Sequence, residues 1–161
     1  MNRIELIVTD EWKEFAKNQI KDFEKTPQGQ WRYADVEAWR GIVCEMLVAK
    51  YLEDNYNVTK KAKGLDTSGI VDECDIIIDN KKVEIKSATK NYFKFLMPKI
   101  HDIYNKPKDI YIASKYNETE TPNKVILIGY LLHSDILQYP IEKNKGASYF
   151  KIPLSDFKDL K

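Results

Sequence analysis

The chain has 161 residues, of which 43% are apolar, and it carries 26 Lys and Arg against 25 Asp and Glu. That length and that apolar fraction predict one compact domain with its own core, residues 1–161, and exclude long disordered spans. The formal net charge of +1 excludes a uniformly basic protein, but it allows a local basic surface around a polyanion.

Residues 9–55 form the predicted N-terminal helical part. The first helix begins at Thr9 or Asp10, either of which can cap it, and apolar residues follow at helical spacing until "TPQGQ" interrupts the pattern. The second helix is predicted from about Asp35 to about Asn55, over "YADVEAWRGIVCEMLVAKYLEDN".

Residues 56–132 form the predicted sheet, which begins with a short strand in 56–64 and a loop over 65–73. A hairpin over 74–89 follows, then a partly helical segment over 91–105 that Pro98 limits or kinks. Strands are predicted over 108–116 and 124–132 from their many β-forming residues. Residues 133–161 add a helical turn, one short strand and a polar tail. This order predicts a mixed α/β fold, with a central mixed sheet of about five strands flanked by helices.

The hairpin "DECDIIIDNKKVEIKSATK" carries charged residues at regular intervals. If Asn80 and Lys81 form a two-residue turn, the facing pairs are Ile78 with Val83, Ile77 with Glu84 and Asp75 with Lys86. Alternation then places the charged side chains on one face and the apolar ones on the other.

Such alternation is also what an ordinary amphipathic hairpin with a wet face shows. The three isoleucines after Asp75, and Val83 and Ile85 around Glu84, favour instead a central strand. A carboxylate in that position needs a partner, commonly a cation or a metal ion.

Glu45 supplies a third carboxylate in an apolar setting. Its helical neighbours at three and four positions are Gly41, Ile42, Val48 and Ala49, so its side chain is predicted to point inward. Partial burial beside a lysine is the alternative.

Three inward carboxylates and a lysine suit metal-assisted phosphodiester hydrolysis. Two or three carboxylates can hold Mg²⁺ and leave positions open for a phosphate oxygen and a water. Lys86 could orient or deprotonate that water, or stabilise the charge of the transition state.

Glu45, Asp75 and "Glu84-Ile85-Lys86" resemble, in this order, the PD-(D/E)xK nuclease superfamily with its restriction-endonuclease-like core. The pattern covers about residues 35–132, although Cys74 stands where a proline often precedes the aspartate. The resemblance implies a Mg²⁺-dependent DNA endonuclease in which Mn²⁺ substitutes for Mg²⁺. It makes Asp75, Glu84 and the backbone carbonyl of Ile85 metal ligands, Lys86 the catalytic lysine, and Glu45 a further ligand or a water-mediated contact.

Two alternatives remain open. "SATKNYFKF", together with Ser68 and Gly69, is similar to archaeal Holliday junction resolvases, which implies a homodimer acting on branched DNA. In the other alternative the protein has the same fold but is not an enzyme. It is then a nucleic-acid-binding or protein-binding module, and its charged cluster is a set of structural ion pairs.

Lysines that surround the motif are candidates for phosphate contacts. These are Lys60, Lys61, Lys63, Lys90 and Lys94. Aromatic residues near the second helix (Trp31, Tyr33, Trp39) and after the motif (Tyr92, Phe93, Phe95) could stack on splayed bases, but core packing is the favoured use for most of them.

Other kinds of site are disfavoured by the residues present. His101 and His133 have no second ligand at three or four positions, and Cys44 and Cys74 do not form a CxxC pair. No glycine-rich phosphate loop predicts a nucleotide cofactor. With no apolar run of about 20 residues and no signal-peptide pattern, we expect a cytoplasmic protein without a membrane partner.

Overall fold

A computed structural model describes residues 3–24, 38–60 and 76–160. Its centre is a six-stranded mixed sheet in which β4 and β6 are parallel and the other neighbours are antiparallel. From one edge to the other the strands are β1 (Ile4–Ile7), β7 (Lys124–Leu132), β6 (Ile110–Asn117), β4 (Lys81–Ala88), β3 (Ile76–Ile78) and β2 (Val58–Lys60). The mixed α/β class predicted from the sequence is therefore confirmed.

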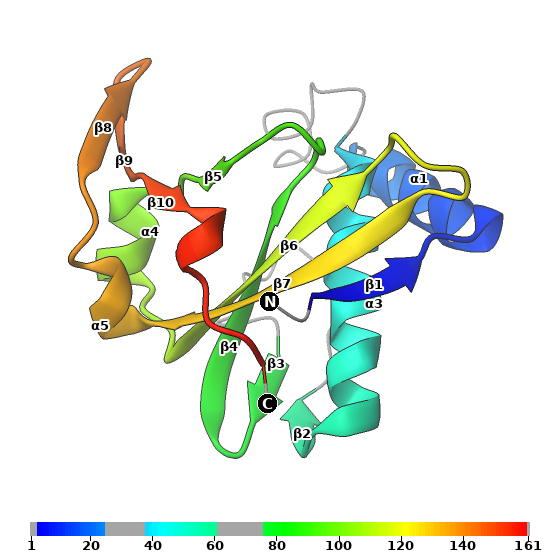
Figure 1. Cartoon of the computed structure of the whole chain (residues 1–161), viewed down its shortest axis with the longest axis horizontal. Coiled ribbons are helices and arrows are strands. Elements are labelled where there is room, and N and C mark those ends of the chain that lie inside the picture. The colour runs from blue at the N-terminus through cyan, green and yellow to red at the C-terminus, as the bar shows by residue number, and fades with distance from the viewer. Residues whose placement is uncertain (1–2, 25–37, 61–75, 161) are drawn as a thin grey trace.

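Helices and C-terminal segments cover the two faces of this sheet (Figure 1). The long helices α1 (Asp10–Glu24) and α3 (Trp39–Asn55) lie on one side. The other side carries α4 (Ile100–Asn105), α5 (His133–Ile136) and the pairs β5–β10 and β8–β9. Their bounds are β5 (Phe95–Leu96), β8 (Ile141–Asn144), β9 (Ala147–Phe150), β10 (Ile152–Pro153) and the 3₁₀ turn η1 (Leu154–Asp156). Within the described residues no helix is long and apolar enough to cross a membrane.

Two apolar cores form, one on each face of the sheet. The first joins α3 to the inner side of the strands, with Val43, Val48 and Ile85 among its buried members. The second lies under α4, α5 and the C-terminal segments, and Ile103 and Phe150 are buried in it. Because strand residues alternate between the faces, each central strand contributes to both cores.

Both long helices agree with their predicted ends where the structure describes them. The α1 helix begins at Asp10, and Thr9 caps it by accepting a hydrogen bond from the Trp12 backbone N–H at 3.3 Å. The α3 helix ends at Asn55 as predicted. Its described part begins at Trp39, and the predicted start at Asp35 lies outside the described residues.

The hairpin register differs from the prediction by two residues. Asp79 and Asn80 form the turn with φ values of 48° and 64°, rather than Asn80 and Lys81, which is the conformation that a type I′ turn requires. Ile77 therefore faces Lys82, and the predicted pairing of Ile77 with Glu84 is wrong. Since a shift of two residues keeps the parity, the division of side chains between the two faces is as predicted.

Three further segments depart from the expected layout. The sheet has six strands instead of about five, because residues 4–7 pair with β7 ahead of the first helix. Residues 95–96 are a short strand, so the segment over 91–105 is helical only after Pro98. The β8–β9 hairpin turns at Lys145 and Gly146, both with positive φ, where the sequence led us to expect one short strand in the tail.

A bulge in β7 fixes where the C-terminal segment docks. Ala113 faces Gly129 while Ser114 faces Leu127, which leaves Ile128 as the extra residue. Next to it, the backbones of Tyr130 and Lys158 exchange two hydrogen bonds of 2.9 and 3.0 Å. A Cβ at Gly129 would lie 2.1 Å from the Lys158 carbonyl oxygen, so only glycine permits this approach.

Candidate functional site

Glu84 and Lys86 project from the same face of β4, an interior strand of the sheet. They are two residues apart, so the alternation of the strand places both side chains on one side. The Lys86 Nζ lies 3.2 Å from Glu84 Oε2, and the side chains are 30% and 24% exposed respectively. The structure thus brings together both charged residues of the predicted Glu-x-Lys motif.

Tyr111 lies beside Glu84 on the neighbouring strand β6. The two residues face each other across the parallel pair, and Tyr111 is 2% exposed. Burial raises the pKa of the Tyr111 hydroxyl to about 12, and the negative charge of Glu84 adds to this shift. The hydroxyl accepts a hydrogen bond of 3.0 Å from the Lys108 backbone N–H. Tyr111 therefore stays neutral and forms an apolar wall of the site.

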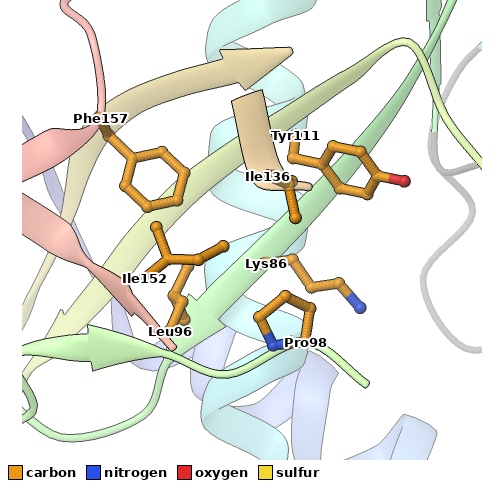
Figure 2. A pocket seen from close by; sticks show the side chains of 7 residues that line it. All are labelled: Lys86, Leu96, Pro98, Tyr111, Ile136, Ile152 and Phe157. Atoms are coloured by element: carbon orange, nitrogen blue, oxygen red, sulfur yellow. The ribbon is translucent and has the colours of Figure 1, made fainter. Parts of the chain in front are cut away.

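Lys86 lies in an apolar pocket on this face. In Figure 2 the carbon stem of Lys86 lies between the rings of Tyr111 and Pro98, and α3 lies behind the strands. The pocket is completed by residues from β5, α5 and the C-terminal segment, namely Leu96, Ile136, Ile152 and Phe157. Apolar walls hold the stem while the ammonium group reaches Glu84.

Glu45 approaches the sheet from the opposite side. It is half-buried on α3, the helix that packs on the face containing Val83 and Ile85. One turn earlier, Gly41 lies against Ser87, and the Cys44 thiol is hydrogen-bonded to Ser87 and Ser114. The predicted inward position of Glu45 is consistent with this burial, but the helix and the Glu84–Lys86 pair lie on different faces of the sheet.

The rest of the predicted metal shell is only partly described. Asp75 lies outside the described residues, and Ile85, the predicted carbonyl ligand, stands between Glu84 and Lys86 with a buried side chain. Over residues 3–24, 38–60 and 76–160, no three His, Cys, Asp or Glu side chains lie close enough together to hold a metal ion. A shared ion at Glu45, Asp75 and Glu84 therefore stays a prediction.

The candidate phosphate-binding lysines fall in two groups. Lys61 and Lys63 lie outside the described residues, and Lys60 is the last residue of β2. Lys90 and Lys94 lie in the segment between β4 and β5, where Lys94 is exposed and Lys90 Nζ lies 5.7 Å from the centre of the Tyr92 ring.

The aromatic residues after the motif are not core residues. Tyr92, Phe93 and Phe95 are 65%, 37% and 41% exposed, so these three are exceptions to the core packing expected for most of the aromatic candidates. No regular spacing could have revealed this, because the segment is neither a helix nor a continuous strand. Trp39, by contrast, packs edge-on against Tyr116 at 5.6 Å between ring centres, as core packing predicts.

Comparison with protein-family models, with curated proteins and with solved structures gives no match to this chain. We therefore infer function from the side chains and their surroundings. The features that matter are the Glu84–Lys86 pair, its apolar pocket, and the exposed rings a few residues further along the chain.

Proposed function

We propose that this chain is a Mg²⁺-dependent DNA endonuclease of the PD-(D/E)xK superfamily, with a restriction-endonuclease-like core. The observation that carries the proposal is the Glu84–Lys86 pair, whose charged atoms are 3.2 Å apart on one face of β4, the interior strand that is the second arm of the β3–β4 hairpin. A carboxylate and a cation in this position provide a metal ligand and a group that binds phosphate or orients water.

The order of the elements supports the proposal. A helix bearing Glu45 is followed by the β3–β4 hairpin, then by the short helix α4 and the strand β6. This is the succession that the resemblance requires, and β6 lies parallel to β4 beside the pair. Such a sheet presents adjacent side chains of β4 at fixed spacing, which is what positioning a phosphodiester requires.

The donor set fits a hard divalent cation. Carboxylate and carbonyl oxygens are the ligands that Mg²⁺ prefers, and the Glu84 carboxylate is partly exposed with one oxygen engaged by Lys86. Glu84, Asp75 and the Ile85 carbonyl would hold the ion, whereas Glu45, whose helix packs on the other face of the sheet, would contribute only through water. When bound, the ion supplies a water of lowered pKa and compensates the charge of the phosphate.

Lys86 is assigned the role next to the scissile phosphate. Its stem is held between Tyr111 and Pro98, so the ammonium group samples few positions. From there it can donate hydrogen bonds to a phosphate oxygen and to the attacking water. Glu84 orients Lys86 through their ion pair. The neutral Tyr111 ring keeps bulk water away from the stem side of the pair.

Cleavage assays on the full chain test this proposal. Linear duplex and four-way junction DNA are incubated with Mg²⁺ or Mn²⁺ and the wild type, Asp75→Ala, Glu84→Gln or Lys86→Met. We expect divalent-metal-dependent cleavage that falls at least about 100-fold in each variant. Lys86→Met preserves the apolar stem, and Lys124→Met, which breaks an ion pair with Glu5 elsewhere on the sheet, is the matched control. Full activity in Glu84→Gln and Lys86→Met would refute the proposal, as would no cleavage of any DNA by the wild type.

A binding module is the second candidate function. It is favoured by the ion pair itself, because Glu84 and Lys86 already satisfy each other without a metal ion. Calorimetric titration of the chain with Mg²⁺ or Mn²⁺ separates the two candidates. The nuclease proposal expects metal uptake that Glu84→Gln abolishes, and a module whose pair is structural expects no uptake that depends on Glu84.

A further inference from the structure

The segment 89–95, which links β4 to β5 and includes the first residue of β5, presents three aromatic rings to solvent. Tyr92 and Phe93 meet edge-on with ring centres 4.8 Å apart, and Phe95 follows two residues later. On β5, Phe95 points outward while its neighbour Leu96 points into the core. Apolar rings exposed at three positions out of four, unlike apolar side chains scattered singly, form a candidate contact surface.

The backbone of this segment is held in place at both ends. The Asn91 N–H donates to Glu118 Oε2 at 3.0 Å, and Lys115 Nζ donates to the Asn91 carbonyl at 3.1 Å. Arg40 donates to the Thr89 carbonyl at 3.2 Å. Further along, the Leu154 N–H donates to the Lys94 carbonyl at 2.9 Å. The rings are thus presented by an anchored backbone, and a ligand would meet them without first ordering a loop.

Lysines lie against two of the three rings. Lys90 Nζ lies 5.7 Å from the centre of the Tyr92 ring, and Lys151 Nζ lies 4.6 Å from that of Phe95. Lys94, between them in sequence, is exposed. Two carboxylates are nearby: Glu118 accepts the Asn91 N–H, and Glu142 pairs with Lys151 at 3.7 Å. The side chains around the rings are therefore mainly cationic.

We propose that Tyr92, Phe93 and Phe95 form a stacking platform for unpaired bases of DNA, with Lys90, Lys94 and Lys151 contacting its phosphates. Rings that alternate with lysines suit a strand whose bases are free to stack and whose backbone is anionic. In a duplex the base faces are already covered, so the platform selects single-stranded or unpaired regions. A protein partner that buried the rings would have to desolvate the same lysines, which disfavours an apolar surface.

The platform adjoins the candidate active site, and in this respect the inference rests on the proposed function. Leu96 and Pro98, which follow the platform directly, line the pocket of Lys86. Lys86 and Lys90 are four residues apart, which limits their Cα separation to about 14 Å. Unpaired DNA held on the platform would thus lead to the Glu84–Lys86 pair, and the substrate class becomes DNA with a single-stranded segment.

Binding of a labelled oligothymidylate in EDTA, followed by fluorescence anisotropy, tests the platform without cleavage. We expect the double variant Tyr92→Ala with Phe93→Ala to raise the Kd at least about fivefold. Tyr92→Phe should bind as the wild type does, because it keeps a ring. Tyr104→Ala is the matched control, since Tyr104 is 58% exposed outside the platform. A blunt duplex of the same length should show less than a twofold change in the double variant.

The outcomes separate the two proposals. An unchanged Kd for the single strand in the double variant overturns the platform, as does an equal loss on the duplex, or no binding of the single strand by the wild type. If the wild type cleaves DNA with a divalent metal ion but the ring substitutions leave single-strand binding unchanged, the nuclease proposal stands and the platform falls. If no variant or wild-type protein cleaves DNA but the ring substitutions still weaken single-strand binding, the platform stands and the nuclease proposal falls.

Discussion

Lys86 combines an apolar stem with a charged end in contact with a carboxylate. The stem contacts Tyr111 and Pro98, and the ammonium group reaches Glu84. An ion pair whose side chains are 30% and 24% exposed contributes little to stability, because solvent screens it. The packing of the stem should therefore matter more to the fold than the charge does.

Lys86→Met tests whether the packing of the Lys86 stem contributes more to stability than its charge does. The methionine keeps an unbranched apolar stem in the pocket and removes the charge, so the free energy of unfolding should change by no more than about 1 kcal/mol. Lys86→Ala also removes the stem and should be the less stable of the two. Urea unfolding followed by circular dichroism measures both values. A larger loss in Lys86→Met than in Lys86→Ala would mean that the charge dominates.

Gly129 and Gly41 are expected to respond oppositely to alanine. In Gly129→Ala the new Cβ would meet the Lys158 carbonyl at 2.1 Å, so the free energy of unfolding should fall by more than about 2 kcal/mol. In Gly41→Ala the nearest atom is Ser87 Oγ at 3.6 Å, an ordinary contact. Because alanine favours a helix, that variant should gain up to about 1 kcal/mol. Thermal unfolding of both proteins checks the two signs.

At the scale of elements, the β3–β4 hairpin shows what a local sequence determines. The alternation of apolar and charged residues predicted which side chains share a face, and Glu84 and Lys86 do so. The register was missed because the turn uses Asp79 and Asn80, both with positive φ. Asp and Asn tolerate that conformation well, and Lys81 does so less readily. A local rule on turn residues would have decided correctly here.

Asn80→Gly is expected to stabilise this turn. The second position of a type I′ turn favours glycine, and Asn80 has a φ of 64°. Asp79 keeps its hydrogen bond with the Asn57 side chain at 3.2 Å. The stability change therefore reports the backbone preference at position 80 alone. The urea midpoint should rise by the equivalent of about 0.5 kcal/mol, with an unchanged denaturant slope. Asn80→Val should lower it, and a lower midpoint in Asn80→Gly would contradict the turn assignment.

The surroundings of the Glu84–Lys86 pair could not be predicted from the hairpin alone. Tyr111 faces Glu84 only because β4 and β6 are parallel neighbours in one particular register. The Lys86 pocket also needs Ile152 and Phe157, which follow in sequence after two further strands of the sheet. Local periodicity carries no information on such pairings, which tertiary packing selects. The exposure of Tyr92 and Phe93 could not be predicted from the sequence for the same reason.

For the whole molecule, β6 connects the two cores and carries a buried tyrosine on each of its faces. Tyr111 belongs to the second core and Tyr116 to the first, with 2% and 0% of their surfaces exposed. Burial raises the pKa of each hydroxyl from 10 to about 12. Neither hydroxyl can ionise at the ordinary pKa of tyrosine while the sheet is intact.

Stability should consequently fall in strong alkali. The folded chain holds the two phenolic protons more tightly than the unfolded chain does, so their contribution is complete below about pH 10 and is lost as the pH rises to about 12. At pH 11 each tyrosine should account for a loss of about 1 kcal/mol. Urea unfolding at pH 8 and pH 11 measures this loss, which should be smaller in Tyr111→Phe and Tyr116→Phe. An equal loss in these variants would assign the alkaline effect to lysines.

The pairing of β1 with β7 has a consequence for the order in which the sheet assembles. Ile4 faces Leu127, which lies 123 positions further along the 161-residue chain. Closing so long a loop costs conformational entropy, whereas α1 and α3 form from contacts within single helices. During synthesis β1 is made well before β7, and it stays without this partner until β7 has been synthesised. We therefore expect β1 to be among the last strands to join the sheet.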